Sequence, residues 1–82
     1  MTTSTHTDEY RALTETLRKA RRNAGLTQQQ LADRLGKPQS YLAKVEGGER
    51  RIDVIEFIAL AKALGDTPST LFETLLIAIK SN

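Results

Sequence analysis

The side chains of this sequence that could do chemistry are amides, hydroxyls and cations, and they gather in the middle of the chain. Three of them, Gln39, Ser40 and Lys44, recur at a spacing that puts them near one side of a helix. A glutamine amide can bond N6 and N7 of adenine, a lysine can bond O6 and N7 of guanine, and a serine is unselective. These residue types therefore predict recognition of a ligand through hydrogen bonds.

The sequence offers no combination of residues that would serve an enzyme or a metal site. Cysteine is absent, and the single histidine, His6, stands in the polar stretch that opens the chain. Thiolate sites, clustered-histidine sites and disulfides are therefore excluded. Ser40 has no histidine on any segment expected to be structured, so no nucleophile and base can pair there. We predict a protein that is not an enzyme and uses no cofactor or metal.

Charge and hydropathy indicate the class of partner and the cellular compartment to expect. Ten of the twelve basic residues precede residue 52, together with six of the ten acidic ones. A basic first part is expected of a nucleic-acid binder, although an ordinary solvated surface would give the same count. No stretch is long and apolar enough to span a membrane, and the Thr/Ser-rich start does not look like a signal peptide. We expect a cytoplasmic, nucleoid-associated protein.

The elements that must position these side chains are helices. Apolar residues recur at three- and four-residue steps throughout, and no segment alternates as a strand would. The pattern predicts an all-α fold of five short helices. Their start and stop signals fall at Asp8 and Gly25, Thr27 and Gly36, Pro38 and Gly47, Asp53 and Gly65, and Thr67 and Lys80.

The second and third of these helices form one unit over residues 27–46, TQQQLADRLGKPQSYLAKVE. They meet at a tight turn on Gly36, where the backbone must bend sharply between two packed helices. The outer face of the third helix is then small, polar and basic, which suits the major groove of DNA. Four apolar side chains can pack inside the angle between the two helices: Leu31, Leu35, Leu42 and Val45.

This unit resembles the helix-turn-helix of the phage repressor and Cro-like family, the XRE type. The resemblance covers roughly residues 10–66, and it implies a lambda-repressor-like DNA-binding domain over 9–66. A disordered tail over 1–8 would precede this domain, and a C-terminal helix over 67–82 would complete the core. The matching positions are Leu26-Thr27-Gln28, Leu31-Ala32, Leu35-Gly36, Leu42, Val45-Glu46, Gly48, Glu49 to Asp53 and Leu60 to Gly65.

The resemblance also implies roles for individual residues. Base edges would be contacted by Gln39, Ser40 and Lys44, and Lys37 and Tyr41 could reach bases or the flanking backbone. Simpler interpretations remain open, with the lysines and the Gln28–Gln30 run as plain solvated surface and Tyr41 packed against the fourth helix. Phosphates would be contacted by Gln28, Arg22, Arg50 and Arg51.

A different role is implied for Arg21 and Glu46. In the family an arginine at the position of Arg21 pairs with a glutamate at the end of the recognition helix, which is Glu46 here. We expect a structural ion pair that joins the first helix to the third. Arg18 and Lys19, in contrast, are expected to lie in solvent on the outer face of the first helix.

The last helix carries more apolar side chains than one core-facing stripe needs. Leu71 and Leu75 are expected to face the core, while Phe72, Leu76 and Ile79 are expected to form a two-fold interface. The alternative is that the whole helix closes the core. A chain this short has a limited core, so a second copy is the expected source of extra buried surface.

The combined expectation is a homodimeric transcription regulator that binds double-stranded DNA at a palindromic operator. Three alternatives stay open. An antitoxin would use the same domain and also mask a toxin, a restriction-modification controller protein would share the fold and size, and a protein-interaction module would bind no DNA.

Overall fold

The computed structural model describes residues 7–81, and it confirms the expected all-α fold. The helix α1 begins at Asp8, and Thr7 caps it by accepting a hydrogen bond from the Tyr10 amide at 3.1 Å. Most of the expected N-terminal tail, residues 1–6, lies outside the described part. The five helices are α1 (Asp8–Asn23), α2 (Gln28–Leu35), α3 (Gln39–Glu46), α4 (Val54–Ala63) and α5 (Pro68–Lys80).

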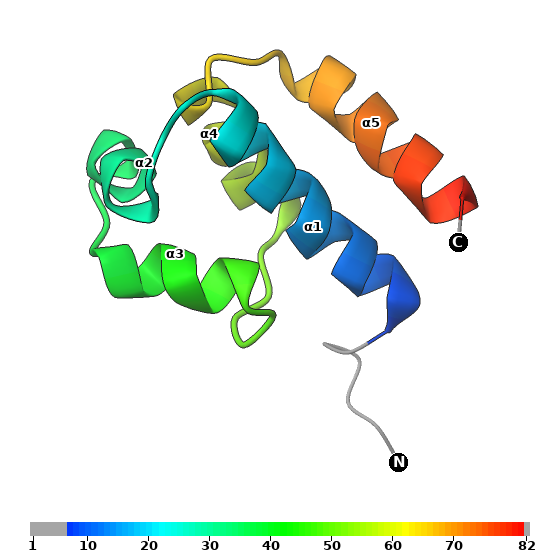
Figure 1. Ribbon diagram of the computed structural model, residues 1–82, viewed down its shortest axis with the longest axis horizontal. Coiled ribbons are helices and arrows are strands. Elements are labelled where there is room, and N and C mark those ends of the chain that lie inside the picture. Colours follow the sequence, from blue (N-terminus) through cyan, green and yellow to red (C-terminus); the bar gives the residue numbers. More distant parts are fainter. Residues whose placement is uncertain (1–6, 82) are drawn as a thin grey trace.

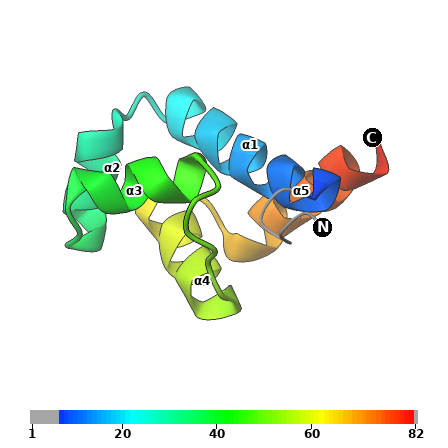
Figure 2. The same ribbon diagram turned by 90° about the horizontal axis from the view of Figure 1, so that it is seen from below.

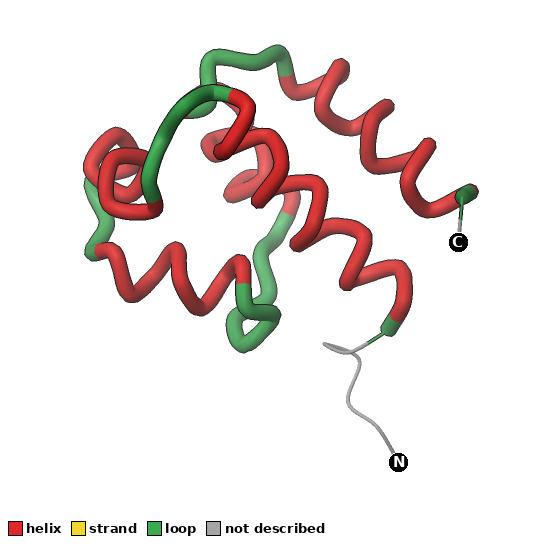
Figure 3. The backbone as a smooth tube through the Cα atoms, in the orientation of Figure 1, coloured by secondary structure: helices red, strands yellow, loops and turns green. Residues whose placement is uncertain are grey.

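The five helices are arranged around α1. In Figure 1, α5 runs along one side of α1 in the opposite direction, and α2 and α3 lie on the other side. Seen from below, α4 projects from the side of the molecule opposite α1 (Figure 2). Figure 3 shows that the connections between these helices are short loops. Within residues 7–81, none of the helices combines the length and apolar character needed to cross a bilayer.

The α2–α3 unit is built as its sequence predicts. Thr27 and Gln30 form the capping box, each side chain bonding the other residue's backbone amide, at 3.1 and 2.9 Å. Gly36 ends α2 with a φ of 68°, a left-handed conformation that glycine adopts without strain. The side chains inside the angle join the core cluster, with Leu31, Leu42 and Val45 fully buried and Leu35 partly buried.

The start of α3 differs from the expectation by one residue. Pro38 was expected to open the helix, but it has an extended backbone and stands just before α3 as its N-cap. It supplies no side-chain cap, although its carbonyl accepts a bond from the Tyr41 amide at 3.0 Å. Gln39 is therefore the first helical residue, at the end of α3 that is closest to α2.

The helix α1 buries two faces, where the sequence pattern predicts one. Leu17 belongs to the central cluster, as its spacing predicts. Ala12 and Thr16 are also buried, at 7% and 5% exposure, on the side that faces α5. Small side chains let two helices approach closely, but they contribute little to a hydrophobic pattern. On α5, Leu71 and Leu75 are buried as predicted.

Candidate nucleic-acid interface

The outer face of α3 carries the side chains predicted to meet base edges. Leu42 and Val45 are at most 1% exposed, and their burial fixes how α3 is rotated against the rest of the domain. Ser40 and Lys44 are consequently exposed on the opposite side of the helix, and Gln39 is exposed in its first turn, beside α2. The helix backbone beneath them is held by the core, so these three side chains are presented from a rigid support.

Tyr41 lies at the edge of this face and is bound to α4. It is half-buried, and its hydroxyl donates to Glu56 Oε2 at 3.3 Å. Burial, together with the nearby Glu56 carboxylate, raises the pKa of Tyr41. The Lys37 ammonium lies 5.2 Å from the centre of the Tyr41 ring. Of the two interpretations open for Tyr41, packing against the fourth helix is therefore the one observed, and a base contact stays a prediction.

Arg50 is held beside the same tyrosine. Its Nη2 lies 2.9 Å from Glu56 Oε2, and its guanidinium lies 4.9 Å from the centre of the Tyr41 ring. Glu56 also accepts a bond from the Asp53 amide at 2.9 Å, which completes the capping box of α4. The bonds from Arg50 and from the Asp53 backbone lower the pKa of Glu56. Glu56 was not among the predicted site residues, although the Asp-x-x-Glu spacing marks it as a capping residue.

Tyr10 anchors the loop that follows α3. Its hydroxyl accepts a bond from the Ile52 amide at 3.1 Å and donates to the Arg50 carbonyl at 3.4 Å. The Arg51 guanidinium stacks over the Tyr10 ring at 4.3 Å from its centre. One buried side chain of α1 thus holds the backbone that carries Arg50 and Arg51, two of the three arginines predicted to contact phosphate.

Replacing Tyr10 with phenylalanine should lower the free energy of unfolding by about 1 kcal/mol, because both hydroxyl bonds are lost while the ring stays in place. Urea unfolding followed by circular dichroism measures the change. Tyr41→Phe removes only the bond to the partly exposed Glu56, so it serves as the control and should lower the free energy of unfolding by less. An equal or larger loss for Tyr41→Phe would contradict the anchoring role of Tyr10.

The predicted ion pair between Arg21 and Glu46 is present, and it is bidentate. Arg21 Nε donates to Glu46 Oε2 at 2.7 Å, and Arg21 Nη2 donates to Glu46 Oε1 at 3.0 Å. The Arg21 and Glu46 side chains are only 10% and 1% exposed. Arg21 also donates to the Leu26 carbonyl at 2.8 Å, so it fastens the α1–α2 loop as well.

The environment of Glu46 keeps its carboxylate charged. Burial alone would raise its pKa, but the bonds from Arg21 and Gln28, with the charge of Arg18, outweigh burial and lower it. The same bond with Glu46 raises the pKa of Arg21. Both partners are therefore ionised at neutral pH, in a place with little access to water.

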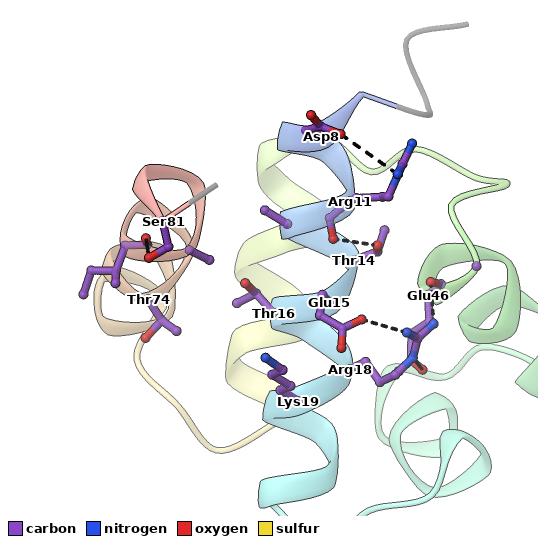
Figure 4. Close-up of a pocket in the computed structure, with 14 residues that line it drawn as sticks. Asp8, Arg11, Thr14, Glu15, Thr16, Arg18, Lys19, Glu46, Thr74 and Ser81 are labelled. Atoms are coloured by element: carbon purple, nitrogen blue, oxygen red, sulfur yellow. Dashed lines mark hydrogen bonds and ion pairs between the residues drawn. The ribbon is translucent and has the colours of Figure 1, made fainter. Parts of the chain in front are cut away.

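Arg18 corrects one expectation of the sequence analysis. It was assigned to solvent, but its Nη2 donates to the Glu46 backbone carbonyl at 2.9 Å, which caps the last turn of α3. Its Nη1 pairs with Glu15 at 2.9 Å, so Arg18 lies between the two acids (Figure 4). Arg18 stands one helical turn before Arg21, and this spacing was the signal that it shares the face turned to α3.

Gln28 and Gln39 are joined across the gap between α2 and α3. Gln39 Nε2 donates to Gln28 Oε1 at 2.7 Å, and Gln28 Nε2 donates to Glu46 Oε1 at 3.0 Å. The side chain of Gln28 bridges the ion pair and the outer face of α3, and its predicted phosphate contact stays a prediction. Arg22, another predicted phosphate contact, is exposed at the end of α1.

The side chains predicted to form a two-fold interface are partly available on α5. Phe72 and Leu76 are 49% and 43% exposed, while Ile79 is half-buried. Phe72 packs edge-on against Phe57 of α4, with ring centres 6.2 Å apart. Val54 and Ile55 at the start of α4, which were not predicted to form an interface, are the most exposed large apolar side chains within residues 7–81. Exposed apolar surface is therefore found on both α4 and α5.

A separate groove runs along α1 between α5 and the end of α3 (Figure 4). Its walls include Ala12 and Thr16 of α1 and Thr74 and Ile77 of α5. Ile77 is 66% exposed, and it projects from α5 on a different side from Phe72 and Leu76. The groove therefore adjoins neither the outer face of α3 nor the expected interface.

Comparisons with known proteins agree with this architecture. A model of the helix-turn-helix family of sequences matches residues 17–72. A helix-turn-helix-type transcriptional regulator of Sinorhizobium fredii is 47% identical over 45 residues, which are 55% of this chain and 58% of that protein. The chain thus spans little more than half the length of this relative.

Two solved structures are similar over more of the chain. An XRE-family-like protein from Pseudomonas syringae pv. tomato is 46% identical, with a TM-score of 0.78 and 84% of each chain covered. The restriction-modification controller protein C.AhdI from Aeromonas hydrophila is 36% identical, with a TM-score of 0.65, covering 71% of this chain and 84% of that one.

Proposed function

Because the chain belongs to the XRE-type helix-turn-helix family of DNA-binding transcription regulators, which are not enzymes, we propose that it binds a palindromic operator as a homodimer. The observation that carries this proposal is the division of α3 into two sides. One side is buried in the core through Leu42 and Val45, and the other exposes Gln39, Ser40 and Lys44. A firmly seated helix with a polar, basic outer face suits entry into the major groove.

In this proposal base edges and phosphates are met by different side chains. Gln39 and Lys44 contact adenine or guanine edges, Ser40 bonds either base, and Lys37 and Tyr41 lie at the margin of the contacted bases. Phosphates are met by Gln28, Arg22, Arg50 and Arg51 around this centre. A two-fold pair would place the second α3 about 34 Å away, one helical turn along the duplex.

Selection of bound sequences from random duplex DNA tests the proposal directly. A single site with two inverted half-sites is expected, and its spacing gives the separation of the two α3 helices. Failure to bind any duplex, even at low salt, would contradict the proposal and favour a protein-interaction module. A site without symmetry would contradict the homodimer only.

Phosphate and base contacts should respond differently to mutation. Log affinity falls as log salt rises, and Arg50→Ala is expected to make this fall less steep by about one unit of slope, because one phosphate contact and its counterion are lost. Gln39→Ala is expected to change base preference at one position and leave the slope unchanged. Titrations of the selected DNA at several salt concentrations measure both quantities. The pairing of Arg50 with Glu56 makes Glu56→Gln the matched control, which should keep the slope or increase it.

Similarity to the controller protein from Aeromonas hydrophila supports a more specific second candidate. In that case the chain would control a restriction-modification system through the same DNA-binding face. A restriction endonuclease gene beside the gene for this chain would support this candidate, and binding of the selected site next to that gene would test it. A gene with no such neighbour would leave the general regulator as the proposed function.

A further inference from the structure

The Arg50 side chain is held on three sides in the loop between α3 and α4, residues 47–53. Its Nη2 lies 2.9 Å from Glu56 Oε2, and its Nη1 donates to the Arg51 carbonyl at 2.8 Å. Its guanidinium also lies 4.9 Å from the centre of the Tyr41 ring. A long arginine side chain in solvent samples many rotamers, and these three contacts restrict it to few of them.

Glu56 is itself held by groups other than Arg50. Its Oε1 accepts a bond from the Asp53 amide at 2.9 Å, and Asp53 Oδ1 accepts a bond from the Glu56 amide at 2.8 Å. Glu56 Oε2 accepts a further bond from the Tyr41 hydroxyl at 3.3 Å. The carboxylate is therefore fixed in the first turn of α4 and tied to α3, so it gives Arg50 a stationary partner.

The held guanidinium keeps enough hydrogen-bond donors for a phosphate. Arginine has five N–H donors, of which Glu56 and the Arg51 carbonyl take one each, so three remain. Two of these are sufficient for a bidentate contact with a phosphate. The Arg50 side chain is 43% exposed, so a ligand in solvent can reach it.

A fixed arginine discriminates between duplexes in a way that a mobile one does not. A mobile side chain can follow a phosphate to wherever the DNA backbone puts it, whereas a fixed guanidinium binds well only where a phosphate lies at one place. Groove width and bending set the positions of the phosphates, and both depend on base sequence. A fixed phosphate contact therefore adds sequence preference at base pairs that the protein does not touch.

We propose that Glu56 is a specificity-determining residue, which holds the Arg50 guanidinium and so makes the protein prefer duplexes whose backbone places a phosphate at that point. The inference rests on the proposed DNA-binding function. Glu56 is a positioning residue here, since only Arg50 would touch the DNA. Sequence preference would then come from the loop after α3 as well as from the outer face of α3.

Glu56→Gln releases Arg50 with little other change. Glutamine also serves at this position of a capping box, but it has one acceptor oxygen where glutamate has two. If that oxygen stays with the Asp53 amide, an NH₂ group faces Arg50, and the guanidinium is no longer held. Glu49→Gln is the matched control, since Glu49 is exposed in the same loop and loses the same charge. Urea unfolding of both variants checks that they are folded.

The first measurement is the ratio of affinities for the selected operator and for a random duplex of the same length, at one salt concentration. Glu56→Gln is expected to lower this ratio about fivefold, the size expected when one long side chain has to be ordered on binding. Glu49→Gln should leave the ratio unchanged, because its charge acts on both duplexes alike. The inference is overturned if the ratio does not fall in Glu56→Gln, or if it falls equally in the control.

The second measurement asks whether the effect passes through Arg50. In an Arg50→Ala background, Glu56→Gln should cause no further fall in the ratio, because no guanidinium is left to hold. A further fall in this background would overturn the inference, since Glu56 would then act on the DNA preference through another group.

The third measurement needs no DNA. In the free protein, the NMR order parameter of Arg50 Nε should lie near that of the buried Arg21 and above that of the exposed Arg22, and Glu56→Gln should lower it to the Arg22 level. An Arg50 as mobile as Arg22 in the wild type, or unchanged in Glu56→Gln, would overturn the inference. If the wild type selects no DNA, the proposed function fails, and the order parameters show independently whether Arg50 is held.

Discussion

Replacing Arg21 with alanine is expected to lower the free energy of unfolding by about 3–5 kcal/mol, because the Glu46 charge would remain buried without its main partner. Glu46 is 2% exposed, so its charge would be poorly solvated once the guanidinium is gone. The change also removes the bond that Arg21 donates to the Leu26 carbonyl. A domain of this size has a total stability of only about 5–15 kcal/mol, so the loss would be a large share of it.

The neighbouring residue provides the control for this experiment. Arg22→Ala removes the same charge and length from the same turn of α1, but Arg22 is exposed, so its effect should stay within about 0.5 kcal/mol. Urea unfolding of both variants, followed by circular dichroism, gives the comparison. Similar losses for the two variants would contradict a buried, structural role for the Arg21–Glu46 pair.

The pH dependence of stability gives the same experiment a second readout. The pKa of Glu46 is lower in the folded protein than the value of about 4.3 expected for an unfolded glutamate. The stability that the ionised Glu46 contributes is therefore present above this unfolded pKa, and it is lost as the pH falls through the lower folded pKa. In Arg21→Ala burial should raise the pKa of Glu46, so mild acidification should recover some stability instead of removing it.

Replacing Leu76 with aspartate is expected to weaken operator binding by about 10²–10⁴-fold, because two half-sites would no longer be bound by linked copies. Leu76 is 43% exposed on α5, so a charge there should be tolerated by the monomer and rejected by an apolar two-fold interface. Analytical ultracentrifugation should show a monomer at concentrations where the wild type is expected to be a dimer. Titration of the selected operator measures the loss of affinity.

The next residue along α5 makes a stringent control. Ile77 is 66% exposed and lines the groove beside α1, away from Phe72 and Leu76. Ile77→Asp adds the same charge one position along and should leave the dimer and its operator affinity unchanged. Dissociation by Ile77→Asp, with Leu76→Asp still dimeric, would move the interface to the groove side of α5.

Local features of the chain explain how much of the fold could be predicted. The α2–α3 unit is specified by short-range signals, since the Thr27–Gln30 capping box begins it and Gly36 must adopt a left-handed turn inside it. Leu31, Leu42 and Val45 are buried where helical periodicity puts them. For such elements the sequence within one or two helical turns contains the necessary information.

The features that were missed depend on how helices meet. Whether Arg18 reaches solvent or the end of α3 is decided by the rotation of α1 against α3, which no local pattern records. The burial of Thr16 against α5 follows from close helix packing and is invisible to a hydrophobic pattern. Gln28 could be expected near phosphate from its position, but its bond to Glu46 requires the positions of two other helices.

The division of α3 into a buried and an exposed side has a consequence for how such a protein can evolve. Ser40 and Lys44 lie outside the core, so they can be exchanged for other side chains with little effect on folding. Gln39 is different, because its amide is paired with Gln28. In the proposed interface, new operators would therefore be reached in single steps through Ser40 and Lys44, whereas Gln39 would have to change together with a residue on another helix.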